Sequence, residues 1–167
     1  MYNLLLVDDE PLIKVAFQSA VEWGKNGFLL AATASNGQEA LHIVETQHID
    51  AVITDLKMPG MDGLALIHEL KKHSFTGPIL VLSNYSDFDS VRAALTDGAY
   101  DYFLKINMNG ESIGEHLEKM ADLLRVQQQR RTEEDHRSFA IEAQKKENAL
   151  IHCAQWAVSY THLRAHE

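Results

Sequence analysis

Short apolar segments alternate along the first 108 residues with stretches in which apolar positions recur every three or four residues. The five largely apolar segments span residues 3–7, 28–34, 51–54, 78–82 and 100–104. Continuous apolar runs that end in turn-forming or polar residues are typical of strands buried on both faces of a sheet. The pattern therefore predicts five strands at these positions.

The stretches between the predicted strands carry the helical period. This period begins after Pro11, which suits the first position of a helix, and it recurs up to Gly98, which suits the position just after a helix. Regular alternation of strands and helices predicts a parallel sheet with helices on both faces. The fold class expected is therefore α/β, a doubly wound five-stranded parallel sheet with a C-terminal helical extension.

Polar residues that could take part in chemistry lie at the ends of four of these strands. They are Asp8, Asp9, Asp55, Ser83 and Lys105. In open parallel sheets ligands bind outside the carboxyl ends of the strands, so these side chains are expected to meet at one edge. Taken one at a time, each is more simply interpreted as a helix cap, a turn residue or a surface lysine. Their joint position at strand ends favours a shared site.

Three carboxylates at one point repel each other unless a cation neutralises them, and oxygen ligands of this kind suit Mg²⁺. The ammonium of Lys105 and the hydroxyl of Ser83 would stabilise a phosphoryl group in transfer. Asp55 follows the middle strand and is the best candidate for a nucleophile that forms an aspartyl phosphate. The adjacent pair Asp8 and Asp9 is better placed to hold the metal.

Four strings carry a resemblance to a known family, the response-regulator receiver domain of two-component signalling. They are LLLVDDEPLI (4–13), ITDLKMPGMDGLALI (53–67), ILVLSNYSDFD (79–89) and GAYDYFLK (98–105). The resemblance covers residues 1–108 and implies the flavodoxin-like receiver fold. It also implies that a sensor histidine kinase phosphorylates the protein, and that the domain acts as a switch and not as an enzyme.

The resemblance assigns roles to individual residues. It makes Asp55 the phosphoacceptor, and it makes Asp8, Asp9 and Asp55 the ligands of Mg²⁺ together with the backbone carbonyl of Lys57. Further roles follow for three residues near the acceptor. Ser83 and Lys105 would bind the phosphoryl group, and Tyr102 would be the aromatic residue that moves with Ser83 during switching.

Three segments resemble the YesN/AraC-type regulators within this family, namely VDDEPLI, ASNGQEAL and SNYSDFDSVRAAL. Members of that type carry a C-terminal helix-turn-helix domain, so DNA binding is expected only through an output domain absent from these residues. A homodimer is an open option, with Arg92 and Asp101 on the face that such domains often use to pair.

Two features depart from the family pattern or tune it. Lys105 is followed by Ile106 where the family usually has proline. A cis bond before a non-proline residue costs about 2.5–4 kcal/mol, so the bond is predicted to be trans, or strained if it is cis, and either case could shift the Lys105 ammonium. Lys57 and Tyr85 stand two residues after Asp55 and Ser83. Neither is an acid or amide that would position a hydrolytic water, which predicts slow self-dephosphorylation.

Residues 109–157 are expected to form a helical linker, the last helix of the receiver continuing into a solvated or dimerising helix. Its apolar positions follow a heptad-like spacing at Ile113, Leu117, Met120 and Leu124. The last ten residues, VSYTHLRAHE (158–167), resemble a translated sequencing adaptor and are expected to be a non-native tail. The natural chain is then expected to continue beyond Ala157.

Composition narrows the function further. The chain has 167 residues, a formal net charge of -9 and a single cysteine. This acidic balance disfavours binding of nucleic acid or anionic lipid by these residues. No apolar run reaches a membrane span and no leader is evident, which predicts a cytoplasmic protein without membrane contact.

Two other functions stay open. One is a stand-alone single-domain regulator that acts by protein–protein binding. The other is a phosphohydrolase with an aspartyl nucleophile, which the adjacent positions of Asp8 and Asp9 disfavour, because such enzymes usually space their two acids as D-x-D.

Overall fold

A computed structural model describes residues 1–84 and 86–165 of the chain. Its strands are β1 (Tyr2–Val7), β2 (Phe28–Ala34), β3 (Ala51–Asp55), β4 (Ile79–Ser83) and β5 (Asp101–Leu104). Its helices are α1 (Pro11–Ala20), α2 (Gly37–Thr46), α3 (Gly63–Lys72), α4 (Phe88–Thr96), the short 3-10 helix η1 (Lys105–Asn107) and α5 (Gly110–Arg164). Each predicted strand coincides with an observed one to within one residue at either end.

The strands form one parallel sheet in the order β2-β1-β3-β4-β5. This confirms the predicted doubly wound α/β fold. The register pairs Asp55 of β3 with Leu82 of β4, and Ser83 of β4 with Leu104 of β5. The carboxyl ends of neighbouring strands therefore lie side by side at one edge of the sheet, which is where the sequence places its polar residues.

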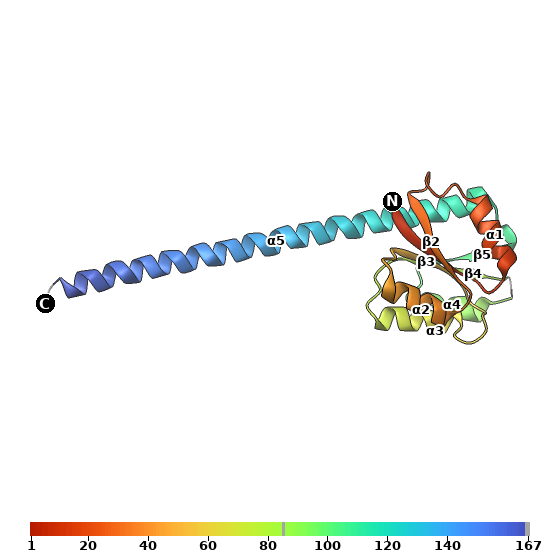
Figure 1. The fold of residues 1–167 in the computed structure, drawn as a ribbon, viewed down its shortest axis with the longest axis horizontal. Helices are drawn as coiled ribbons and strands as arrows, with labels where there is room; N and C mark the ends of the chain where they lie inside the picture. Colours follow the sequence, from red (N-terminus) through yellow and green to blue (C-terminus); the bar gives the residue numbers. More distant parts are fainter. Residues whose placement is uncertain (85, 166–167) are drawn as a thin grey trace. The chain divides into compact units, whose positions relative to one another are not determined.

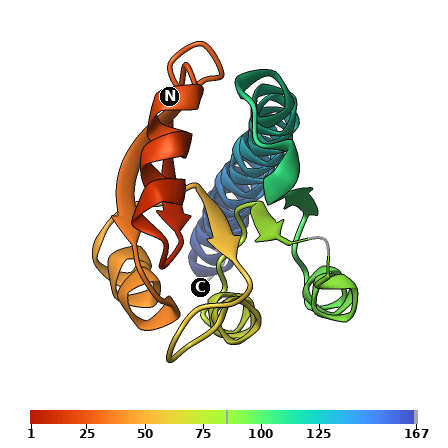
Figure 2. The same cartoon turned by 90° about the vertical axis from the view of Figure 1, so that its right-hand side faces the viewer.

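Alternate residues of the strands point to opposite faces, and each face has its own apolar core. Leu5 and Val7 pack under α2, α3 and α4, whereas Leu4 and Leu6 pack under α1 and the first part of α5. Figures 1 and 2 show this layering, with α1 and the start of α5 on one side of the sheet and the other three helices on the opposite side. Burial on both faces explains the uninterrupted apolar runs in the sequence.

The local sequence sets the helix boundaries. Pro11 opens α1, and the side chain of Asp62 caps α3 by accepting a hydrogen bond from the backbone N–H of Ala65 at 2.9 Å. Gly98, beyond the end of α4, has a φ of 103°. An L side chain rarely adopts such a backbone conformation, so glycine suits this helix end, as the sequence predicted.

The chain separates into two units, Met1–Arg125 and Val126–Glu167. The first contains the whole sheet and the buried seam of α5, whose members are Ile113, Leu117, Met120, Ala121 and Leu124. The seam packs in the same apolar cluster as Leu4 and Leu6 of β1.

The described part of the second unit, residues 126–165, is helical up to Arg164, and its side chains are almost all exposed, including that of Cys153. No helix in the described ranges has the length and apolar character that a membrane crossing needs. Residues 166–167 of the predicted tail lie outside the described residues. The boundaries at 108 and 157 and the foreign origin of the tail stay predictions.

Candidate functional site

The carboxyl ends of β1 and β3 present the three predicted aspartates. The backbone N–H of Asp8 continues the ladder to β2 by donating to the carbonyl of Ala34 at 3.0 Å. Asp55 is the last residue of β3, and the hydroxyl of Thr54 donates to its carbonyl at 2.9 Å. Strand pairing thus fixes both backbones, so the two carboxylates face each other across the junction of β1 and β3.

Helix α3 closely approaches the end of β3. A Cβ atom on Gly63 would lie 2.2 Å from the backbone oxygen of Asp55, so no side chain fits there without movement. The N–H of Gly63 also donates to the carbonyl of Leu56 at 2.9 Å. Gly63 therefore allows the start of α3 to pack directly against the residue that carries the candidate nucleophile.

The structure brings Asp8, Asp9 and Asp55 together as a group able to hold a cation. Each offers one carboxylate oxygen, and these oxygens lie within 4.8 Å of one another. Asp8 and Asp55 are buried, while Asp9 is more exposed. Burial raises the pKa of Asp8 above its usual range, although the backbone N–H of Glu10 donates to its Oδ1 at 2.8 Å and opposes that shift. The donor set fits a hard divalent cation such as Mg²⁺.

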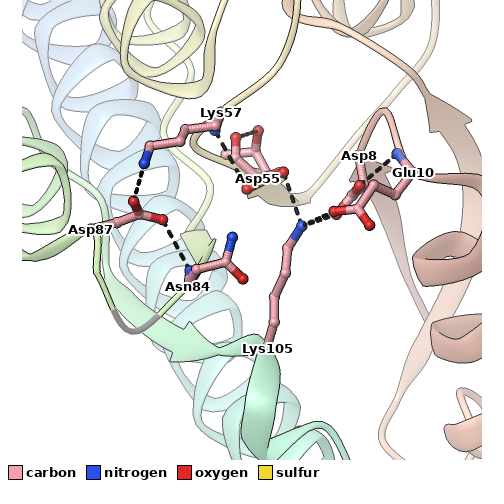
Figure 3. Close-up of polar contacts among 8 residues, drawn as sticks. Asp8, Glu10, Asp55, Lys57, Asn84, Asp87 and Lys105 are labelled. Atoms are coloured by element: carbon pink, nitrogen blue, oxygen red, sulfur yellow. Dashed lines mark hydrogen bonds and ion pairs between the residues drawn. The ribbon is translucent and has the colours of Figure 1, made fainter.

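Lys105 lies between these carboxylates, as Figure 3 shows. Its Nζ is 2.9 Å from Oδ2 of Asp55, 3.0 Å from Oδ2 of Asp8 and 3.1 Å from Oε1 of Glu10. Burial disfavours the charged form of Lys105, but its hydrogen bonds to Asp55 and Asp8 outweigh burial, and its pKa lies above the usual range. The ammonium of Lys105 is therefore held in place by three carboxylates.

Ser83 and Tyr102 border a pocket of about 720 Å³ between α4 and β5. Ser83 is fully buried, and its hydroxyl has no hydrogen-bond partner in the described structure. Tyr102 is 42% exposed. The unpaired hydroxyl is free to take a new acceptor, and the pocket lies open beside the tyrosine ring.

Lys57 contacts two parts of the site. Its backbone N–H donates to Oδ1 of Asp55 at 3.4 Å, and its ammonium forms an ion pair with Oδ1 of Asp87. The hydrogen bond from Lys57 is the main cause that lowers the pKa of Asp87. Tyr85, the other residue expected to tune phosphoryl lifetime, lies outside the described residues.

Sequence reasoning missed two acidic residues that contact the site. Glu10 pairs with Lys105, and Asp87 pairs with Lys57. Both precede a helix, a position at which an acid is most simply interpreted as a cap. No spacing in the sequence distinguishes such a cap from the partner of a distant lysine. The predicted trans bond between Lys105 and Ile106 is confirmed.

The sheet order and the acidic edge define a receiver-type signalling domain. Residues 4–118 match the response regulator receiver domain family, and the chain belongs to that family. It is therefore a receiver domain of the kind used in two-component systems.

Relatives and solved structures agree with this assignment. The chain is 37% identical over 125 residues to the transcriptional regulatory protein YesN of Bacillus subtilis, covering 75% of this chain and 34% of that protein. It is 36% identical over 108 residues to the transcriptional regulatory protein MalR of the same organism, covering 63% of this chain and 44% of that protein. The predicted resemblance to YesN-type regulators is confirmed. The chain spans less than half the length of these curated relatives.

Among solved structures, the receiver domain of AraT, a response regulator from Geobacillus stearothermophilus, superposes with a TM-score of 0.71 at 27% identity. The match covers 76% of this chain and 98% of that one. A response regulator receiver domain from Clostridium thermocellum gives a TM-score of 0.62 at 26% identity, covering 75% of this chain and 98% of that one.

Proposed function

We propose that this chain is a phosphoaccepting switch in which Asp55 takes a phosphoryl group from a sensor histidine kinase. The observation that carries the proposal is the placement of Lys105, whose Nζ lies 2.9 Å from Asp55 and 3.0 Å from Asp8 beside a third carboxylate. A carboxylate nucleophile flanked by a fixed ammonium and a cation site is suited to phosphoryl transfer.

The transfer is a displacement at phosphorus. An Oδ atom of Asp55 forms the new P–O bond, and the P–N bond to the kinase's phosphohistidine breaks. The leaving imidazole nitrogen keeps the electron pair and takes a proton from solvent. Lys105 and the hydroxyl of Ser83 then bind the phosphoryl oxygens. The close packing of α3 at Gly63 supports the end of β3, which carries Asp55.

Asp8, Asp9 and Asp55, with the backbone carbonyl of Lys57, are the residues that would hold Mg²⁺. When bound, the ion neutralises charge on the phosphoryl oxygens. The fit is supported by the three converging carboxylate oxygens. Asp9 is the most accessible of the three.

Switching is proposed to run through Ser83 and Tyr102. A phosphoryl group on Asp55 offers acceptor oxygens to the buried, unpaired hydroxyl of Ser83. Movement of Ser83 toward Asp55 leaves space that the ring of Tyr102, now 42% exposed, can enter from the adjoining pocket. A charge change at the strand edge would thus alter the surface over α4 and β5.

The response acts on transcription in this proposal. The similarity to transcriptional regulators supports a DNA-binding output domain of AraC type, attached beyond the residues described and joined by α5. The chain itself is proposed to be non-enzymatic, cytoplasmic and without affinity for DNA or membranes. A stand-alone regulator that binds a protein partner through the same surface is the second candidate, favoured by the apolar pocket beside Tyr102.

The decisive experiment is incubation with a small-molecule phosphodonor and Mg²⁺, followed by intact-mass measurement. The wild-type chain is expected to gain one phosphoryl group that is labile to alkali, and Asp55→Asn is expected to gain none. Asp97→Asn, an exposed aspartate at the end of α4, is the matched control and should label like the wild type. Equal labelling of wild type and Asp55→Asn contradicts the acceptor assignment.

A further inference from the structure

The ion pair between Lys57 and Asp87 joins the loop that follows β3 to the residue just before α4. The side chain of Lys57 is 65% exposed, whereas that of Asp87 is 1% exposed. Among the described residues, the carboxylate of Asp87 also accepts a hydrogen bond of 3.0 Å from the N–H of Asn84. A buried carboxylate needs a compensating cation, so Asp87 depends on Lys57 to stay where it is.

Asp87 is not used as an ordinary helix cap. It occupies the N-cap position of α4, but its side chain accepts no hydrogen bond from the first turn of that helix. The carboxylate instead faces Lys57 and Asn84, as Figure 3 shows. The carboxylate at the start of α4 therefore contacts the loop after β3 and Asn84, and it does not cap the first turn of the helix.

Lys57 also contacts Asp55, the proposed phosphoacceptor. Its backbone N–H contacts the carboxylate of Asp55 at 3.4 Å, while its ammonium holds Asp87. A phosphoryl group on Asp55 would be a second, stronger anion within reach of the same flexible and largely exposed side chain. One ammonium cannot fully compensate both anions.

We propose that the Lys57–Asp87 ion pair is a latch that holds Asp87 and the start of α4 in their unphosphorylated arrangement and that opens when the phosphoryl group draws Lys57 away. The inference rests on the proposed function, because it needs phosphorylation of Asp55. Once its cation has gone, Asp87 moves into solvent and takes the first turn of α4 with it. Asp87 is a positioning residue in this scheme, and Lys57 acts through its side chain independently of its backbone carbonyl.

The Lys57–Asp87 contact of the unphosphorylated protein is tested by amide hydrogen exchange, without phosphodonor or metal. Asp87→Asn keeps the size of the side chain and an acceptor for Asn84, but it removes the ion pair. Exchange at the amides of Asn84 and of the first turn of α4 is expected to accelerate several-fold in Asp87→Asn and in Lys57→Met. Asp97→Asn, the same charge change at an exposed position at the opposite end of α4, is expected to leave this exchange unchanged.

The opening of the latch is tested by a double-mutant cycle. The quantity measured is the fraction of protein phosphorylated at a subsaturating concentration of a small-molecule phosphodonor with Mg²⁺. Asp87→Asn removes the competitor for Lys57, so it is expected to raise that fraction several-fold in the wild-type background. In the Lys57→Met background the same substitution is expected to change little. Phosphorylated wild type should also show the accelerated exchange of unphosphorylated Asp87→Asn.

The outcomes separate the latch from the proposed function. Unchanged exchange in Asp87→Asn overturns the latch even if Asp55 is phosphorylated. An equal gain from Asp87→Asn with and without Lys57 overturns the competition for the ammonium. Failure of every form, including wild type, to accept a phosphoryl group overturns the proposed function and with it the opening step, while the exchange result still decides the resting contact.

Discussion

At the scale of single residues, the site is organised by the balance between carboxylates and two lysines. Lys105 bridges Asp8 and Asp55, and Lys57 compensates the buried Asp87. The sequence predicted Lys105 because it ends a strand. It did not reveal Glu10 or Asp87, because an acid just before a helix has an ordinary local use and the partner lysine is distant or on another loop.

Replacing Lys105 with methionine is expected to separate metal binding from phosphorylation. Loss of the ammonium leaves Asp8 and Asp55 to repel each other, so Mg²⁺ should bind more tightly and raise the melting temperature by more than it does in the wild type. Phosphorylation should fall strongly, because the phosphoryl oxygens lose a fixed positive charge. Calorimetric Mg²⁺ titration checks this, with Lys71→Met on α3 as control, and weaker Mg²⁺ binding in Lys105→Met contradicts it.

The residue after Lys105 is expected to matter little for phosphorylation. The bond to Ile106 is trans, and the ammonium nevertheless reaches Asp55 at 2.9 Å. Ile106→Pro should therefore leave the rate of phosphorylation by a small-molecule donor close to that of the wild type. A large acceleration in Ile106→Pro would show that the natural residue keeps Lys105 from its working position.

At the scale of elements, the strands were the most predictable part. They are buried on both faces, so their apolar runs have sharp ends, and each was located to within one residue. The seam of α5 was also visible in the spacing of Ile113, Leu117, Met120 and Leu124. The packing of α3 against the acceptor loop could not be foreseen, because it depends on the absence of a side chain at Gly63.

Two glycine substitutions are expected to act in opposite directions. Gly63→Ala places a Cβ 2.2 Å from the backbone oxygen of Asp55, and the required shift should cost about 1–3 kcal/mol of the free energy of unfolding. Gly114→Ala, within α5, meets nothing closer than 3.6 Å and should gain about 0.5–1 kcal/mol from helix propensity. Urea unfolding monitored by circular dichroism measures both, and a stable Gly63→Ala variant would contradict the close approach.

At the scale of the whole molecule, the buried apolar clusters are made entirely by residues within Met1–Arg125. A fragment of residues 1–125 is therefore expected to unfold with the same free energy as the full chain. A fragment of residues 1–112 lacks the buried seam of α5 and is expected not to fold, because removal of even one such side chain costs about 2–5 kcal/mol. Denaturant unfolding of the three forms decides this, and a clear loss of stability in 1–125 contradicts it.

The single cysteine gives a direct way to follow the second unit. Cys153 is exposed and is the only thiol in the sequence, so one spin label or dye attaches there with no substitution elsewhere. Two labels brought close by a dimerising helix would couple magnetically or transfer excitation, whereas a solvated linker would leave each label isolated. The native cysteine is thus a labelling site with which one can measure whether signalling brings two copies of the chain together.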